Sequence, residues 1–282
     1  FIKKIELFFF SIMFLIGILS DTKILRSAKL RFLLQGITIF FLVTYFNLHT
    51  SDIRVPLLNY LLEYKILSYI FFTFSLLIVT NGTNFIDGLN GLVINYYLLI
   101  LILILNVDVI NEILNIKIFI LNYIVLLFYL LLFNLLNKLY LGDSGSYFLG
   151  VSVGSLLIFI YKEISFISPF FIVLLLWYPC FENLFSIIRK KRFNLSPLNA
   201  DNKHLHHLLF FYLHSKYNFT KLSSNNISGM LINFINLMFF IIGANYLNSS
   251  FIQIILIFSL ILIYIISYLL LFKFRYKKIF NH

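Results

Sequence analysis

Four short segments hold most of the side chains in this 282-residue chain that could do chemistry. Their sequences are NGTNFIDGLNGL (81–92), YLGDSGSYFLG (140–150), DNKHLHHLL (201–209) and SDTKILRSAKLRF (20–32). They combine carboxylates, carboxamides, imidazoles and cations. Carboxylates beside a basic segment are typical of a site for a divalent metal and a phosphorylated ligand, because Mg²⁺ prefers oxygen ligands and is commonly shared with substrate phosphates.

The segment 81–92 interrupts a long apolar run with polar residues and three glycines. Asn84, Asp87 and Asn90 are spaced three apart, so on a helix they would lie along one side. The glycines would let backbone or a ligand approach closely. The alternative is a helix cap without further function, because Asn and Asp commonly open helices.

In the segment 140–150, Asp143 and Ser144 lie where a helix should begin. A helix N-terminus exposes free N–H groups and attracts anions, so an anionic ligand is expected near these two residues. The alternative is a simple N-cap followed by a packing face of small residues.

Three of the six histidines fall within four positions of the segment 201–209. On a helix, His204 and His207 would share a face and His206 would point elsewhere. Zinc is disfavoured, because no Cys accompanies the histidines and Asp201 is the one nearby acid. We expect a cluster that contacts phosphate or handles protons. The alternative is a solvated polar loop.

The segment 20–32 places Asp21 at the end of an apolar run, followed by four cations in the next ten residues. The acid would lie at a membrane boundary beside a basic loop. The alternative is a plain cytoplasmic anchor, since loops of this kind need no other purpose.

Membrane-spanning helices must position these segments, because the chain is 61% hydrophobic and 12% charged. A soluble domain is about half apolar and a quarter charged. Continuous Leu, Ile and Phe runs favour helices over barrel strands. Nine spans are predicted: 5–19, 30–48, 66–81, 88–106, 118–136, 146–161, 166–183, 228–247 and 250–272. The expected fold is an all-α polytopic transmembrane bundle, a single integral membrane domain over residues 1–282.

Charge in the connections predicts the orientation. Sixteen of the 22 Lys and Arg lie in alternate connections and the C-terminal tail, and positive loops stay cytoplasmic. The long polar loop 184–227, with the histidines, is therefore predicted to be cytoplasmic. The net charge of +11 follows from this topology, and nucleic acid is not expected as a partner. The acids expected at the cytoplasmic face are Asp21, Asp87, Asp143, Glu182 and Asp201.

Taken together, the four segments resemble the motifs of the polyprenyl-phosphate N-acetylhexosamine-1-phosphate transferase family over about residues 17–210. The H-x-H-H pattern resembles the N-acetylglucosamine-1-phosphate branch more than the peptidoglycan branch. The resemblance implies transfer of a sugar-1-phosphate, by default N-acetylglucosamine-1-phosphate, from a UDP-N-acetylhexosamine to undecaprenyl phosphate with release of UMP. It also implies Mg²⁺, with Mn²⁺ as an alternative, a cleft on the cytoplasmic face of the bacterial inner membrane, and a role at the start of O-antigen or related cell-surface polysaccharides.

The resemblance assigns roles residue by residue. It implies catalytic roles for Asp21, Asp87, Asp143 and His204, with Asp143 and Asp87 as metal ligands. It implies substrate contacts from Asn84, Asn90, Tyr140, Arg189, Arg192, His206 and His207. Tyr140 would stack on uracil, and either arginine would hold phosphate.

Two departures from the family pattern bear on activity. Ser20 precedes Asp21 where the family usually has a second aspartate, and Asn90 replaces another common Asp. A phosphate monoester with a second pKa of about 6 is already largely dianionic at neutral pH, so attack does not require the missing base. The chain begins with Phe1, so we expect either that it starts inside a longer chain, with N-terminal spans of the family upstream, or that a non-standard start is used.

Two other functions stay open. A cation- or proton-coupled transporter could use the same acids and histidines, but transporters place such groups near the midplane in repeated halves. A catalytically impaired relative is suggested by Ser20 and Asn90. The oligomeric state is also open, with a homodimer as one option.

Overall fold

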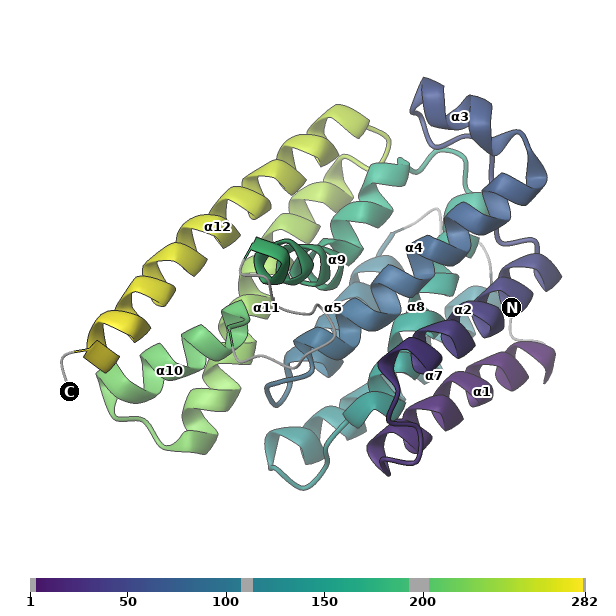
Figure 1. Cartoon of the computed structure of the whole chain (residues 1–282). Helices are drawn as coiled ribbons and strands as arrows, with labels where there is room; N and C mark the ends of the chain where they lie inside the picture. The colour runs from purple at the N-terminus through teal and green to yellow at the C-terminus, as the bar shows by residue number, and fades with distance from the viewer. Residues whose placement is uncertain (1–3, 108–113, 193–202, 281–282) are drawn as a thin grey trace.

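The computed structural model describes residues 4–107, 114–192 and 203–280. These ranges contain eleven α-helices and no strand, so the all-α prediction is confirmed (Figure 1). The helices are α1 (Lys4–Asp21), α2 (Ala28–Tyr45), α3 (Pro56–Leu62), α4 (Lys65–Ile86), α5 (Leu92–Leu105), α7 (Leu114–Leu135), α8 (Gly142–Glu163), α9 (Pro169–Arg192), α10 (Leu205–Tyr217), α11 (Lys221–Asn245) and α12 (Ser250–Phe280).

Each of the nine predicted spans coincides with one of these helices. In the described part of the chain, α2, α4, α7, α8, α9, α11 and α12 are long and apolar enough to cross a membrane. The apolar part of α1 from Leu7 to Asp21 and the whole of α5 are shorter. With 14 residues, α5 falls below the roughly 20 residues that a bilayer core requires. The chain is therefore a multi-pass membrane protein.

The centre of the bundle is formed by α4 and α8. Helix α8 packs against α1 and α4, and α4 also packs against α2 and α9. Figure 1 shows α1 and α2 on one side and α10 and α12 on the other. Within their spanning windows, 72% of α8 residues are buried but only 22% of α7 and α12 residues. The outer helices therefore face lipid, and the inner ones position the polar segments.

Glycines let the inner helices touch. A Cβ on Gly17 of α1 would lie 2.2 Å from the Cα of Ser144 in α8. A Cβ on Gly82 of α4 would lie 2.2 Å from the carbonyl oxygen of Pro179 in α9. Small residues allow such close backbone contact between membrane helices. The ends of α1, α4 and α8 and the middle of α9 therefore lie close together.

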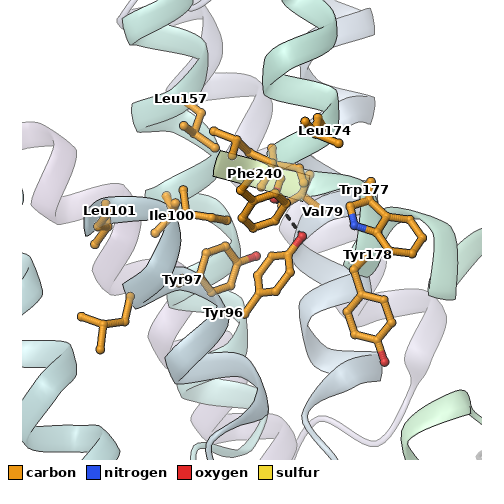
Figure 2. Close-up of a cluster of buried hydrophobic side chains, with 14 of the residues drawn as sticks. Val79, Tyr96, Tyr97, Ile100, Leu101, Leu157, Leu174, Trp177, Tyr178 and Phe240 are labelled. Atoms are coloured by element: carbon orange, nitrogen blue, oxygen red, sulfur yellow. Dashed lines mark hydrogen bonds between the residues drawn. The ribbon is translucent and has the colours of Figure 1, made fainter. Parts of the chain in front are cut away.

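An aromatic cluster forms the middle of the core, with Tyr96, Trp177 and Phe240 packed together (Figure 2). Pro179 lies inside α9 and cannot donate to the carbonyl of Leu175, four residues earlier. The Tyr96 hydroxyl donates to that carbonyl at 2.8 Å. Since an unpaired backbone group is costly in lipid, this side chain stabilises the proline-containing helix.

The predicted connection 184–227 contains helical segments. Helix α9 continues to Arg192, and α10 and the start of α11 fill much of the remainder. Helix α9 continues past the end of the apolar run because the basic residues of its last turn are good helix formers and complement the helix dipole. Asp201 lies outside the described residues.

Candidate active site

The first part of the site is the junction of α1 with α8. Asp21 is the last residue of α1, and Asp143 lies in the first turn of α8, as predicted. The carboxylate of Asp21 accepts the backbone N–H groups of Asp143 at 2.9 Å and Ser144 at 3.1 Å. The anion at this helix N-terminus is therefore supplied by the chain itself.

The carboxylate of Asp143 is held from several helices. Arg31 Nη1 lies 2.9 Å from its Oδ2, and the Ser20 hydroxyl donates to the same oxygen. The Asn84 amide donates to Oδ1 at 2.6 Å, and the Tyr147 hydroxyl donates to Oδ2 at 3.3 Å. Ser20, where the family usually has an acid, thus supports Asp143 with a hydroxyl.

Asp87 is the residue that ends α4, and its carboxylate accepts the backbone N–H of Gly142. Burial, and after it repulsion from Asp143 and Asp21, together raise the pKa of Asp87 to about 7. The three acids therefore lie near enough to feel one another's charge. A bound cation would offset this repulsion.

The donor atoms around Asp87 and Asp143 suit Mg²⁺. Within the described ranges, no three His, Cys, Asp or Glu side chains gather closely enough to hold a metal ion by themselves. Mg²⁺ usually keeps several waters and binds one or two carboxylates together with substrate phosphates. Oxygen donors from Asp87 and Asp143 fit that pattern.

The prediction that Asn84, Asp87 and Asn90 share one side of a helix is wrong. Helix α4 ends just before Asp87, and the connection to α5 contains Gly91 at φ 74°. The Asn84 side chain contacts Asp143, whereas the Asn90 amide donates to Asn137 Oδ1 at 3.2 Å. Because α4 ends between the two asparagines, at Asp87, their side chains point to different neighbours.

Asn90 and Tyr140 meet at the same side chain. Asn90 is 5% exposed, and its backbone N–H donates to Asn225 Oδ1 at 2.6 Å. The Tyr140 hydroxyl donates to Asn137 Oδ1 at 3.0 Å, while the residue is 72% exposed. The buried Asn90 therefore holds the turn in place, whereas the ring of Tyr140 is exposed.

The second part of the site is the histidine cluster. His204 is an extended residue directly before α10, so the prediction that it shares a helical face with His207 while His206 points elsewhere is wrong. The His204 and His206 rings stack with centroids 5.5 Å apart, and the His206 and His207 centroids are 4.3 Å apart. Burial, then His207 and His204, lowers the pKa of His206 well below its ordinary value.

The turn after α4 joins the two parts. A Cβ on Gly88 would lie 2.4 Å from His206 Nε2 and 2.8 Å from His207 Cε1. Asp87 therefore lies between the acids of the α1–α8 junction and the histidines. Residues far apart in the sequence meet at one end of the bundle.

Glu182, which the sequence placed among the acids of the cytoplasmic face without an individual role, also belongs to the site. It is fully buried in α9, and its Oε1 lies 2.8 Å from His204 Nδ1. The Tyr264 hydroxyl donates to Oε2 at 2.7 Å. The signal in the sequence is an acid within an apolar stretch, which is a functional indication in a membrane helix.

The two candidate arginines are placed differently. Arg189 is 8% exposed, and its guanidinium donates to the Lys203 carbonyl, to the Tyr268 hydroxyl at 3.1 Å and to Ser186 Oγ at 3.3 Å. Arg192 is exposed at the end of α9. Arg189 therefore anchors the residue before His204, and the predicted phosphate contact fits Arg192 better.

A family model described as Glycosyl transferase family 4 matches residues 5–161. The chain belongs to this family. A Bacillus subtilis protein described as a probable undecaprenyl-phosphate N-acetylglucosaminyl 1-phosphate transferase is 32% identical over 206 residues, which cover 70% of this chain and 55% of that protein. A decaprenyl-phosphate N-acetylglucosaminephosphotransferase of Mycolicibacterium smegmatis is 33% identical over 90 residues, 28% of this chain and 22% of that protein.

The glycosyl transferase family 4 match confirms the resemblance seen in the sequence motifs. It contains Asp21, Asp87 and Asp143, and it ends before the histidines. The aligned part of the chain spans about half the length of the B. subtilis relative.

Proposed function

We propose that this protein transfers N-acetylglucosamine-1-phosphate, or another N-acetylhexosamine-1-phosphate, from a UDP-sugar to undecaprenyl phosphate and releases UMP. The observation that carries the proposal is the gathering of Asp21, Asp87 and Asp143 beside the histidine cluster at one end of a membrane bundle. The names of the two relatives support the lipid and the sugar.

In this reaction an oxygen of the lipid phosphate bonds to the sugar-bearing phosphorus, and the bond from that phosphorus to UMP breaks. Phosphoryl transfer between anions is mainly a problem of charge and alignment. Asp143 and Asp87 would hold Mg²⁺, or Mn²⁺ in its place, which neutralises the diphosphate and stabilises the leaving UMP. Arg192 and the histidines would bind the remaining phosphate oxygens, and Tyr140 would stack on uracil.

The lipid acceptor requires a path from the bilayer. An apolar cavity of about 350 Å³ lies among α3, α4, α8 and α9. Its lining includes Ile53, just before α3, and Leu184 of α9. We propose that it accepts part of the polyprenyl chain. The distribution of Lys and Arg supports a site on the cytoplasmic face of the bacterial inner membrane, with the product entering O-antigen or a related cell-surface polysaccharide.

The test uses the purified chain in lipid nanodiscs with undecaprenyl phosphate, Mg²⁺ and a panel of UDP-sugars. UMP release is measured together with the mass of the lipid product, and EDTA and Mn²⁺ replacement test the metal. Asp143→Asn keeps the shape but removes the charge, and should lower the rate by about 100-fold or more. Asp52→Asn, the same change on an exposed residue in the connection that follows α2, should leave the rate unchanged. A parent protein no faster than Asp143→Asn would refute the proposal.

A further inference from the structure

Glu182 is a buried acid that the proposed reaction does not use. It is fully buried, and its two oxygens are taken by His204 Nδ1 at 2.8 Å and the Tyr264 hydroxyl at 2.7 Å. Burying a charge is costly unless it is paired and hydrogen-bonded. Because both oxygens already have side-chain partners, Glu182 acts on the site through His204 rather than by contact with substrate.

His204 is held from several directions. Arg189 binds the carbonyl of Lys203, the residue before it. The His204 ring stacks on His206 at 5.5 Å and lies 5.9 Å from the Phe85 ring. His206 in turn abuts Gly88, next to Asp87. The imidazole therefore links a buried carboxylate on α9 to the turn that carries Asp87. Among the residues that the structure describes, Lys190, His207 and Tyr264 are further charged or titratable groups in this neighbourhood.

The chemistry of the pair fixes the imidazole tautomer. An ionised carboxylate can only accept hydrogen bonds, so the nitrogen that faces it must carry the proton. The hydrogen bond at one ring nitrogen sets the state of the other. With Nδ1–H directed at Glu182, Nε2 on the opposite edge of the ring is left to meet a ligand.

We propose that Glu182 is a positioning residue that fixes His204 with the proton on Nδ1 and Nε2 directed toward the substrate phosphates. The role toward substrate rests on the proposed function, whereas the tautomer does not. Outer partners that orient a functional histidine typically change activity by about 10- to 100-fold when they are removed.

Glu182→Gln is the sharpest perturbation. The Tyr264 hydroxyl can donate its hydrogen bond to the new amide oxygen. The amide NH₂ then faces Nδ1 of His204. His204 must then accept at Nδ1 and carry its proton on Nε2. We expect kcat to fall by about 10- to 100-fold with little change in the KM for the UDP-sugar. Glu182→Asp keeps an accepting carboxylate and should restore part of the rate.

The tautomer is measured directly by ¹⁵N solid-state NMR of histidine-labelled full chain in bilayers. The His204 signal is assigned by its loss in His204→Gln. We expect Nδ1–H in the parent and in Glu182→Asp, and Nε2–H in Glu182→Gln. Glu163→Gln is the matched control, because Glu163 is exposed at the other end of α8 from Asp143, and it should change neither spectrum nor rate.

The outcomes separate the two proposals. A folded Glu182→Gln with the parent tautomer and rate would overturn the positioning role. If that variant fails to fold, a parent spectrum in which Nδ1 of His204 carries no proton would also overturn the positioning role. A parent that shows the expected tautomer and its switch, but no transfer of sugar phosphate, would support the positioning of His204 and refute the proposed function.

Discussion

The contact between Gly88 and the histidines can be tested with a single methyl group. Gly88 does not have a positive φ and is exposed, so alanine is compatible with its backbone. The added Cβ would lie 2.4 Å from His206 Nε2 and 2.8 Å from His207 Cε1. Gly88→Ala therefore perturbs the histidine cluster rather than the turn itself.

The size of the effect follows from these distances. Ordinary contact begins at about 3.4 Å, so the methyl group comes about 1 Å too close to His206. His206 is fully buried and lies beside His204 and His207, so its ring must displace a neighbour to make room. A misplacement of about 1 Å costs roughly 100-fold in rate, and we expect a loss of about that size.

The assay is UMP release by the variant in nanodiscs, with thermal unfolding as a check on the fold. Gly36→Ala on α2 is the matched control, since its Cβ would lie 3.5 Å from Leu77 Cδ1, an ordinary contact. That variant should keep full activity. A Gly88→Ala protein that is folded and as active as Gly36→Ala would show that the turn does not position the histidines.

Two further predictions concern Asp87 and Tyr96. Because the pKa of Asp87 is raised to about 7, a proton must leave before a cation binds. The half-saturating Mn²⁺ concentration, followed by EPR, should therefore fall about tenfold for each unit by which the pH rises toward 7, and should stay constant above pH 7. A half-saturating concentration that does not change with pH would contradict this. Tyr96→Phe leaves the Leu175 carbonyl without its donor and should lower the free energy of unfolding in SDS titrations by about 1–2 kcal/mol. The lipid-facing change Tyr129→Phe should have no effect, and equal stability of the two variants would refute the role of Tyr96.

The helical spans were predictable because hydropathy reports directly on which segments can cross a bilayer. The ends of α1 at Asp21 and the start of α8 near Asp143 were also predictable, since polar residues and glycines mark those boundaries. The helix that carries His206 and His207 was harder to predict, because α10 is only partly apolar and does not span a membrane.

Side-chain partners could not be predicted from spacing. Asn84 and Asn90 look equivalent in the sequence, yet one binds Asp143 and the other binds Asn137. Helix α4 ends between them, at Asp87, and nothing in the spacing of the asparagines reveals that end. The partnership of Glu182 with His204 depends on the packing of α9 against the segment before α10, which only the three-dimensional arrangement shows.

The hydrogen-bonded junction of Asp21 with the start of α8 has a consequence for biosynthesis. All of its atoms belong to the first 144 residues, whereas the histidines follow some sixty positions later. Chains emerge from the ribosome N-terminus first. A nascent chain can therefore form the hydrogen bonds between Asp21 and α8 before the histidine cluster has been synthesised. We expect ribosome-stalled intermediates that end after α8 to resist proteolysis between α1 and α2 but to show no catalytic activity.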